Sequence, residues 1–555
     1  MIFEEELKDL IQKSLQTCFK VKKDSPPIII EIPKEKKYGE FTSNVAMQLT
    51  KVLRKPPFEL ATQLSEKIKM DLPRGPLKDK IQKVEVVHPG FINFYLSPDA
   101  RYDLLVHVLK EKENFGRSTF GQKKKVQIEF VSANPTGPLS VAHGRQAAVG
   151  DALANIMNFV GFHVTKEFYV NDEGNQINLL GRSIEFRTRE ILGEEIQFPA
   201  EGYQGDYISE MAKIFLEKNK ISSVKNLEGK TAAIQQFGVD YLLEVIKKEL
   251  DDFGVHFDIW SYQSKIATKQ NIESVLDFLG EKGFLYEKEG ALWFKSTDFG
   301  DDKDRVVEKS DGSHTYLTPD IVYHRDKFKR GFDKVINIWG PDHHGYILRL
   351  KAAVEALGYE QDDLVVLIVQ LATIYRHGQP ISMSTRRGQY ISLREVMEEV
   401  GVDAARFFFL MRRISAHLDF DLELAKKQTP ENPVYYIQYA HARVYSIFEK
   451  AKETSLSLKN SHFSRLKEVE EFDLLDKIAQ FPEILVACTQ QYNPFPLVSY
   501  LQEVAILFHK FYEKHRVLNE EDKDLSAERL ALIEATCIVL ANGLRLVGVS
   551  APKKM

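Results

Sequence analysis

The chain has 555 residues, which corresponds to three or four domains of ordinary size. Hydrophobic residues make up 43% of it and charged residues 28%, as in typical globular proteins, so wholesale disorder is excluded. Because 75 Lys and Arg face 80 Asp and Glu, the formal net charge is −5 and the chain is not a polycation. Any contact with nucleic acid must therefore use local basic surface.

The N-terminal 118 residues mix helical and strand patterns. Residues 4–20 and 57–70 have helical periodicity, whereas 28–32 and two runs within 84–96 are rich in β-branched residues. The N-terminus lacks the basic and apolar parts of a signal peptide, and no apolar run approaches the ~20 residues of a membrane span. Three cysteines lie far apart without a CxxC pair. We expect a small α+β domain at 1–118, in a cytoplasmic protein that makes no membrane contact.

Residues 119–430 alternate between strand and helix patterns. Strands are expected at 126–131, 167–170, 335–339 and 364–369, the last as a buried parallel strand, with a mostly helical stretch over 175–280. This alternation predicts an α/β fold, a Rossmann-type doubly wound parallel sheet with helical insertions. Residues 431–555 read almost entirely as helix, which predicts an all-α C-terminal bundle.

The segment VQIEFVSANPTGPLSVAHGR runs from a strand through a Pro- and Gly-rich turn into a helix that begins near Val141. At the carboxyl edge of a parallel sheet, the free N–H groups of such a helix bind phosphate, and His143 in its first turn could donate a hydrogen bond. The alternative is a structural turn capped by Ser140. A second segment, GQPISMSTRRGQYISL, carries Arg386 and Arg387 in a loop of small residues that could close over a polyphosphate; the alternative is an exposed basic loop.

Several long blocks of the chain resemble arginyl-tRNA synthetases, a family of class I aminoacyl-tRNA synthetases. SVAH at 140–143 and SMSTR at 382–386 are similar to the two class I signatures. FYVNDEGNQI, IWGPDHHGYILRLKAA and GVDAARFFFLMRR are similar to further blocks of the family, as is YYIQYAHARVYSI near the C-terminus. Ser140 stands where the first signature usually has His, and SMSTR lacks both lysines of the second signature.

The resemblance implies an enzyme that activates L-arginine with ATP and Mg²⁺, then esterifies the 3′-terminal adenosine of tRNA(Arg). It implies a monomer with a tRNA-elbow domain at 1–118, a catalytic domain at 119–430 and an anticodon-binding domain at 431–555, without a tightly bound metal. By residue, it assigns catalysis to Ser140, His143 and Arg386, arginine binding to Glu129, Ser132, Asn134, Tyr316, Asp320 and His343, ATP binding to Pro138, His143, Gly144, Gly340, Asp342, His344, Met383 and Ser384, and tRNA binding to Tyr436, Tyr439 and Met555.

Some of these residues also have a purely structural interpretation. Asp320 could start a helix capped by Thr318, and Glu129, which alternates with apolar neighbours, could face solvent. Asp172 is a further candidate for the substrate cation. Tyr436 and Tyr439, three positions apart, could be bundle core instead of platforms for unpaired bases.

Two other functions remain open on the sequence. The altered signatures fit a non-catalytic tRNA-binding relative, although the intact acidic and aromatic positions argue against it. A nucleotidyltransferase of the same superfamily, acting on a small molecule, is the other alternative. A complete helical C-terminal region argues against that function, because such an enzyme has little use for an anticodon reader.

Overall fold

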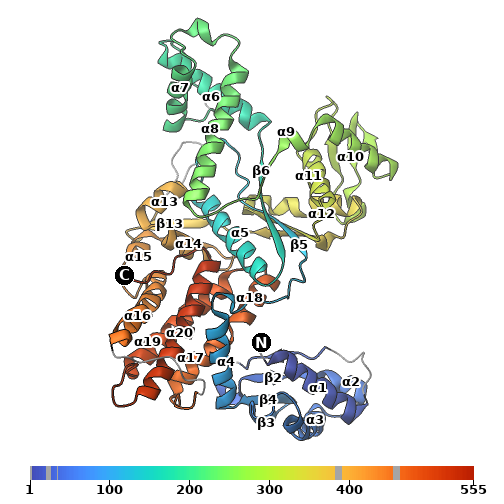
Figure 1. Cartoon of the computed structure of the whole chain (residues 1–555). Coiled ribbons are helices and arrows are strands. Elements are labelled where there is room, and N and C mark those ends of the chain that lie inside the picture. The colour runs from blue at the N-terminus through green and yellow to red at the C-terminus, as the bar shows by residue number, and fades with distance from the viewer. Residues whose placement is uncertain (1–2, 21–26, 34, 200, 382–390, 454–462) are drawn as a thin grey trace.

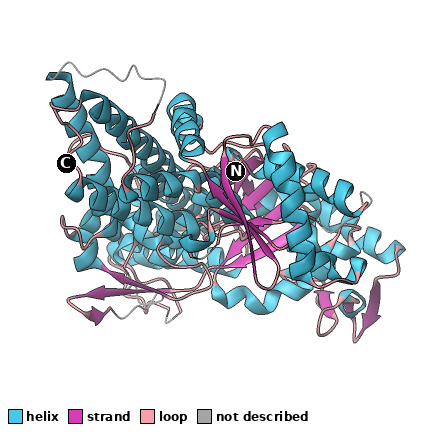
Figure 2. Cartoon of the chain, turned by 90° about the horizontal axis from the view of Figure 1, so that it is seen from below, coloured by secondary structure: helices cyan, strands magenta, loops and turns pink. Residues whose placement is uncertain are grey.

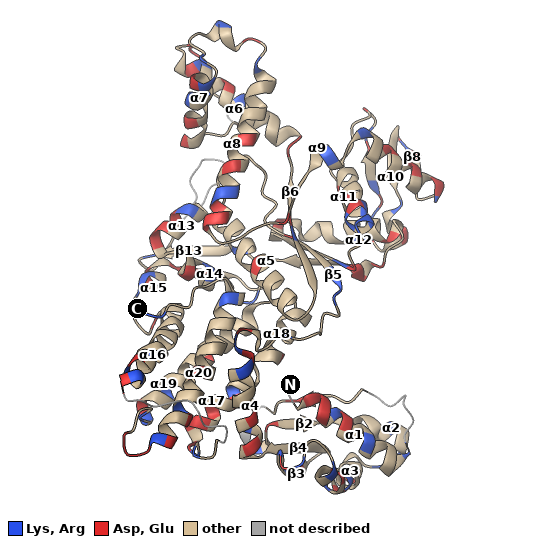
Figure 3. Ribbon diagram, in the orientation of Figure 1, with Lys and Arg blue, Asp and Glu red and all other residues tan. Residues whose placement is uncertain are grey.

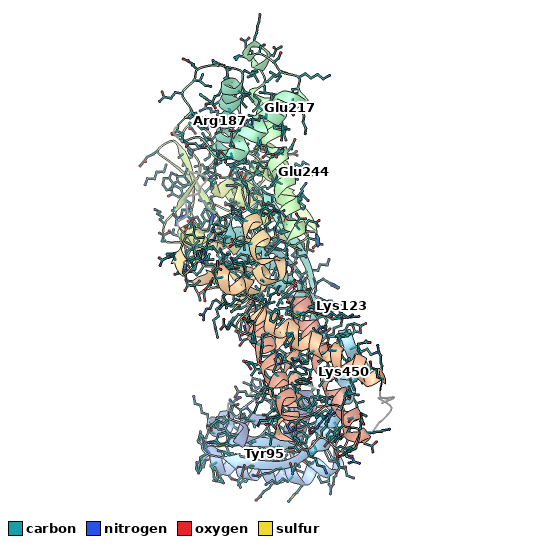
Figure 4. All side chains as sticks on the ribbon, turned by 90° about the vertical axis from the view of Figure 1, so that its left-hand side faces the viewer. Tyr95, Lys123, Arg187, Glu217, Glu244 and Lys450 are labelled. Carbon is teal, nitrogen blue, oxygen red and sulfur yellow. The ribbon has the colours of Figure 1, made fainter. Side chains whose placement is uncertain are left out.

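The computed structural model describes residues 3–20, 27–33, 35–199, 201–381, 391–453 and 463–555. Figures 1 and 4 show an elongated molecule, with an N-terminal domain at one end, a helical insertion at the other, and a parallel sheet and a helix bundle between them. Tyr95 marks the N-terminal domain in Figure 4, Lys450 the bundle, and Arg187, Glu217 and Glu244 the insertion. Acidic and basic residues are interspersed over all these parts in Figure 3.

The N-terminal domain is an antiparallel sheet covered by helices, as the sequence predicts. Its sheet has the order β1-β2-β4-β3. The elements are α1 (Glu4–Phe19), β1 (Ile30–Glu31), β2 (Phe41–Ser43), α2 (Val45–Leu53), α3 (Pro57–Asp71), β3 (Ile81–Val87) and β4 (Phe91–Leu96). Apolar faces of these helices and strands form a core of their own, separate from the rest of the molecule.

Helix α4 (Pro98–Glu111) attaches this domain to the C-terminal bundle. Arg101 donates to Asp476 of α17 (Val469–Ala479) over 2.7 Å and also pairs with Glu40 of the N-terminal domain. The Tyr102 hydroxyl donates to the Leu466 carbonyl over 2.7 Å. Leu105 and Val108 are fully buried in the same core as the bundle. Helix α4 therefore packs as a member of the bundle, although it belongs to the start of the chain.

The central sheet is five-stranded and fully parallel, with the order β12-β11-β5-β6-β7. Its strands are β5 (Lys125–Glu129), β6 (His163–Val170), β7 (Ile259–Tyr262), β11 (Lys334–Trp339) and β12 (Leu364–Ile368). Figure 2 shows these strands fanned in a twist among the surrounding helices. The predicted doubly wound sheet is confirmed, with β12 at its edge.

Helix α5 (Val141–Phe159) packs unusually close to the central sheet, because small residues line it. A Cβ atom on Gly150 would lie 2.3 Å from the Phe130 ring, which is closer than carbon atoms can approach. Fifteen of its residues are buried, so the helix is covered on nearly all sides. This fixes the middle of α5 against Phe130, which directly follows β5.

Two insertions interrupt the sheet. The first is a helical unit with its own core, α6 (Asn175–Ile191), α7 (Asp206–Lys218) and α8 (Thr231–Asp252). The second comprises α9 (Gln263–Ile266), α10 (Lys269–Glu281), β8 (Leu285–Lys288), β9 (Ala291–Phe294), β10 (Arg305–Glu308), α11 (Leu317–Lys329) and, after β11, α12 (Ile347–Ala356). The mostly helical interpretation of 175–280 missed β7, a strand of the central sheet itself, because its four residues, IWSY, are too few to show a periodicity.

A small sheet and the bundle complete the chain. The sheet contains β13 (Ala372–Arg376), β14 (Gln379–Pro380) and β15 (Leu418–Asp421), beside α13 (Leu393–Val400), α14 (Val402–Leu410) and α15 (Leu422–Lys426). The bundle contains α16 (Pro433–Glu453), α17, α18 (Phe481–Gln490), α19 (Phe495–Lys514) and α20 (Lys523–Leu546). No helix in the described part of the chain is long and apolar enough to cross a bilayer.

A buried ion pair joins helix α5 to the end of the bundle. Arg406 on α14 is fully buried and donates to Asp151 on α5 over 2.5 Å. The same guanidinium donates to the carbonyls of Val547, just after α20, and Phe253, just after α8. One charged group thus fixes four separate segments of the chain.

Candidate active site

The strand order of the central sheet reverses between β5 and β11. In parallel sheets this is where ligands bind, outside the carboxyl ends of the strands. The turn 130–140 follows β5 there, and a 3₁₀ helix, Pro341–Tyr346, follows β11. Backbone φ angles of 67° at Val131 and 38° at Ser132 turn the chain sharply away from β5, a left-handed conformation that is rare for a β-branched residue.

Ser140 and His143 close the first turn of α5 on each other. The Ser140 N–H donates to Nδ1 of His143 over 3.1 Å, and the Ser140 hydroxyl lies at the same distance from that nitrogen. Because Nδ1 accepts, the proton of the neutral ring is carried by Nε2. Burial lowers the pKa of His143 to about 4, so His143 is a neutral donor at physiological pH. Ser140 and His143 thus form the N-terminal cap of α5, and donation from Nε2 of His143 to a phosphate oxygen stays a prediction.

The segment after the second signature lies against the first. The Leu393 N–H donates to the Leu139 carbonyl over 2.8 Å, and Ser392 bridges to Ser140. A Cβ atom on Gly144 would lie 2.7 Å from the Leu393 side chain, so a larger residue there would require Leu393 to shift. Pro138 lies in the turn just before Leu139. Met383, Ser384, Arg386 and Arg387 lie outside the described residues, so their assigned roles stay predictions.

Glu129 does not face solvent, contrary to the structural alternative. It ends β5, is 6% exposed, and accepts from Lys327 Nζ over 2.5 Å through one oxygen. Its other oxygen accepts from the Ser132 hydroxyl over 2.9 Å. Lys327 lies on α11. No local pattern in the sequence connects it with Glu129, because the two residues are far apart in the chain.

Asp320 is a partly buried carboxylate in the first turn of α11. Its Oδ2 accepts from the Tyr346 hydroxyl over 2.6 Å. Burial raises the pKa of Asp320 to about 7. The cap interpretation was wrong, because Thr318 lies inside the helix and donates to the Val307 carbonyl over 2.6 Å. Tyr316, which immediately precedes α11, is 70% exposed.

Asn134 and Asp172, two further candidates for arginine binding, make hydrogen bonds within the protein. Asn134 donates to Gln176 over 2.7 Å, which joins the turn after β5 to the first turn of α6. Asp172 accepts from the Ser264 amide over 3.0 Å and from its hydroxyl over 2.5 Å, so it holds the start of α9. Both oxygens of Asp172 are therefore engaged by Ser264. Tyr169 and Tyr323 are stacked with their ring centroids 4.4 Å apart. Glu129, Ser132 and Asp320 lie around this pair of tyrosines.

The segment after β11 presents polar side chains at the edge of the sheet. Asp342, His343 and His344 are exposed, and Gly340 begins the turn that carries them. The His343 ring lies 5.7 Å from that of Trp339. Within the described ranges, no group of three or more His, Cys, Asp and Glu residues is arranged to hold a metal ion.

Arg145 is a buried residue of the first signature segment that the sequence analysis left without a role. Its guanidinium is fully buried and donates to four carbonyls, those of Gln370, Leu371, Arg413 and Ala416, over 2.7 to 3.3 Å. Burial lowers its pKa to about 10. These carbonyls directly precede β13 and β15, so Arg145 fixes the small sheet to the first turn of α5.

The predicted tRNA-binding residues lie on α16 and at the C-terminus. Tyr436 and Tyr439 are half-buried, neither core nor fully exposed, and both contact the ring of His509 on α19. The Arg443 guanidinium lies 4.6 Å from the Tyr439 ring centroid. Met555 is 54% exposed. The aromatic and basic side chains therefore form one partly open surface.

Comparisons with known proteins agree along the whole chain. A family model described as "tRNA synthetases class I (R), catalytic domain" matches residues 105–410, "Arginyl tRNA synthetase N terminal domain" matches 5–96 and "DALR anticodon binding domain" matches 437–555. Arginine–tRNA ligase 1 of Halalkalibacterium halodurans is 47% identical, over 96% of this chain and 95% of that protein. Arginine–tRNA ligase of Bacillus subtilis is 43% identical, over 99% of each chain.

A solved structure supports the same fold. The arginyl-tRNA synthetase of Thermus thermophilus has a TM-score of 0.76 to this chain at 21% identity, and the match covers 99% of this chain and 100% of that one. The catalytic model covers more than half of the sequence, and relatives align over nearly all of it. The chain therefore belongs to the arginine–tRNA ligase family.

Proposed function

We infer that the chain is an arginine–tRNA ligase. It activates L-arginine with ATP to arginyl-adenylate and esterifies the 3′-terminal adenosine of tRNA(Arg), with release of AMP and pyrophosphate. The observation that carries this function is where three residues stand around the point at which the parallel sheet reverses its strand order: Glu129 ends β5, His143 lies in the helix that follows it, and Asp320 accepts from Tyr346 after β11. The chain is also similar to arginine–tRNA ligases over its full length.

The reaction needs positioning and charge stabilisation more than proton transfer. The arginine carboxylate attacks the α-phosphate of ATP and pyrophosphate leaves. We propose that the N–H groups at the start of α5 and the Nε2–H of His143 hold phosphate oxygens, with Gly144, Gly340, Asp342 and His344 around the nucleotide. Mg²⁺ would enter with ATP, since phosphate oxygens supply ligands that this ion prefers.

Substrate selection follows from the acidic side of the site. A guanidinium offers five N–H donors in one plane, which a carboxylate accepts as a fork. We propose that Asp320 takes this role, while Glu129, Ser132 and Asn134 contact the remaining polar groups of arginine. Tyr316 and His343 would cover the site from its exposed side.

Charging mixed tRNA with each amino acid in turn tests this function. Arginine should be the one amino acid charged well, since a site that pairs all polar groups rejects analogues that leave some unpaired. Equal charging with lysine would contradict the assignment. Absence of arginine-dependent ATP–pyrophosphate exchange, with tRNA present, would favour the non-catalytic relative.

Arginine binding should weaken as the pH falls below 7. Burial raises the pKa of Asp320 to about 7, and only its ionised form pairs with a guanidinium. Protonation of Asp320 must therefore be reversed for binding, so KM for arginine should rise roughly tenfold for each pH unit below about 6.5. Initial rates of charging between pH 5.5 and 8.5 measure this, and a flat KM would contradict it.

His143 should act as a neutral hydrogen-bond donor. Because its pKa is lowered to about 4, kcat should show no step from this residue between pH 5.5 and 8. His143→Gln keeps an N–H near the position of Nε2, whereas His143→Ala removes it. We expect His143→Ala to lose on the order of 10²-fold in pyrophosphate exchange and His143→Gln markedly less. Equal losses would indicate that the donor is not used.

The aromatic surface on α16 should serve tRNA and not the adenylate. Tyr436→Ala, Tyr439→Ala and removal of Met555 should each raise KM for tRNA, with about 1–3 kcal/mol per lost base–aromatic stack. The KM for ATP and arginine should stay unchanged. Charging assays with varied tRNA test this, and loss of the folded state would instead assign the tyrosines to the core.

We further propose that the enzyme works as a monomer in the cytoplasm. The three cysteines are free in the structure, with Cys18 exposed, which fits a reducing compartment.

A further inference from the structure

A chain of buried polar groups runs beneath the acidic side of the site. It starts at Glu129, which Lys327 Nζ contacts over 2.5 Å, and Lys327 also donates to Asn337 Oδ1 over 2.9 Å. Asn337 on β11 lies 2.8 Å from His324 Nε2, and His324 Nδ1 lies 2.8 Å from the backbone carbonyl of Asp320. The chain thus joins the ends of β5 and β11 to the first turn of α11.

One arrangement of protons satisfies every bond in this chain. Lys327 can only donate, so the oxygen of Asn337 accepts from it and the Asn337 amide group donates to His324 Nε2. The proton of a neutral His324 is then carried by Nδ1, which donates to the Asp320 carbonyl. Burial and the nearby Lys327 ammonium hold the pKa of His324 well below its usual range, in agreement with this neutral form.

Lys327 supplies the cation of this chain of polar groups and is completely buried. Its side chain is 0% exposed, and its ammonium lies 4.3 Å from the centroid of the Tyr323 ring. Burying a carboxylate is costly unless it is paired with a cation and hydrogen-bonded. Lys327 supplies that cation to one oxygen of Glu129, while the Ser132 hydroxyl donates to the other oxygen.

We propose that Lys327 is a positioning residue for arginine recognition, which holds the Glu129 carboxylate in a fixed orientation for the substrate. This inference rests on the proposed function and extends it, because it assigns a role to a residue that itself stays beneath the site. Asn337 and His324 act through Lys327, as they fix its ammonium between β11 and α11.

The test variant is Lys327→Met, which keeps the length of the side chain and removes its charge. We expect the KM for arginine to rise at least tenfold at pH 7, with the KM for ATP within twofold of wild type. Lys329→Met is the matched control, since Lys329 is an exposed residue of the same helix. It should leave the KM for arginine unchanged, and thermal denaturation should show both variants folded.

A double-mutant cycle with Glu129 separates positioning from a merely structural role. If Lys327 acts through Glu129, Lys327→Met should raise the KM for arginine less than threefold in a Glu129→Gln background, against at least tenfold in the wild-type background. The kcat of Lys327→Met at saturating arginine should stay within twofold of wild type, whereas a merely structural loss would lower kcat and raise the KM for ATP as well.

The outcomes distinguish this inference from the proposed function. If wild type charges no tRNA with arginine, the proposed function fails. If wild type charges arginine but folded Lys327→Met has an unchanged KM for arginine, or raises that KM equally in the wild-type and Glu129→Gln backgrounds, the positioning role fails. Should Lys327→Met not fold, Asn337→Ala tests the same chain: a three- to tenfold higher KM for arginine supports the role, and an unchanged KM overturns it.

Discussion

Asp320→Asn is expected to cost about 2–5 kcal/mol in kcat/KM for arginine, if the ion pair with the substrate is desolvated. The substitution removes the charge and keeps the shape. An Asn oxygen still accepts the hydroxyl of Tyr346, so the first turn of α11 keeps its contact. The loss should therefore appear in arginine selection, measured as kcat/KM for arginine, and the KM for ATP should stay within about twofold of wild type.

The same helix provides the control for this experiment. Asp326→Asn breaks an ion pair of 3.0 Å with Arg330. The Asp326 side chain is 43% exposed, and such exposed pairs contribute about 0–1 kcal/mol to stability. It should leave kcat/KM for arginine close to wild type. A change below about 0.5 kcal/mol for Asp320→Asn would mean that Asp320 serves α11 and not the substrate.

Asp151→Ala is expected to lower the free energy of unfolding by about 3–5 kcal/mol, because it leaves the guanidinium of Arg406 buried without a counter-ion. Arg406 is 0% exposed, so water cannot replace the lost carboxylate, and Lys166 Nζ, 3.0 Å from Asp151, loses its partner as well. Urea denaturation followed by circular dichroism measures the loss as a shift of the midpoint.

Glu431→Gln is the matched control for the buried pair. Glu431 contacts Lys427, and both side chains are about half exposed, at 66% and 47%. Removing that charge should change the free energy of unfolding by less than about 1 kcal/mol. Equal effects of Asp151→Ala and Glu431→Gln would show that burial of the Arg406 pair adds no stability.

The sequence predicted elements with long or strongly periodic patterns and missed short ones. The apolar runs of β11 and β12 and the helix after Val141 were predicted close to their observed bounds. The β7 strand was missed because four residues carry too little periodicity, and its place in the sheet depends on pairing with β6. Pairing between distant segments is a property of the fold that local pattern does not record.

The residues of the candidate site could likewise be predicted where they belong to one motif, and not where they come from different elements. Residues within one motif, such as Ser140 and His143, could be connected from their spacing alone, and the structure shows them in contact. Lys327 and Tyr346 could not be found, because each acts on a residue from another element, Glu129 on β5 and Asp320 on α11. Lys327 reads as an ordinary helical lysine in sequence, and only its complete burial reveals its partner.

The attachment of α4 has a consequence for how the chain is made. Arg101 and its partner Asp476 are 375 positions apart. A ribosome that adds ~5–20 residues per second needs roughly 20–75 seconds between them. During that interval α4 has left the ribosome, but α17 and α20, which cover its apolar side, do not yet exist. The apolar face of α4 therefore has no bundle helix to cover it until the last part of the chain is made.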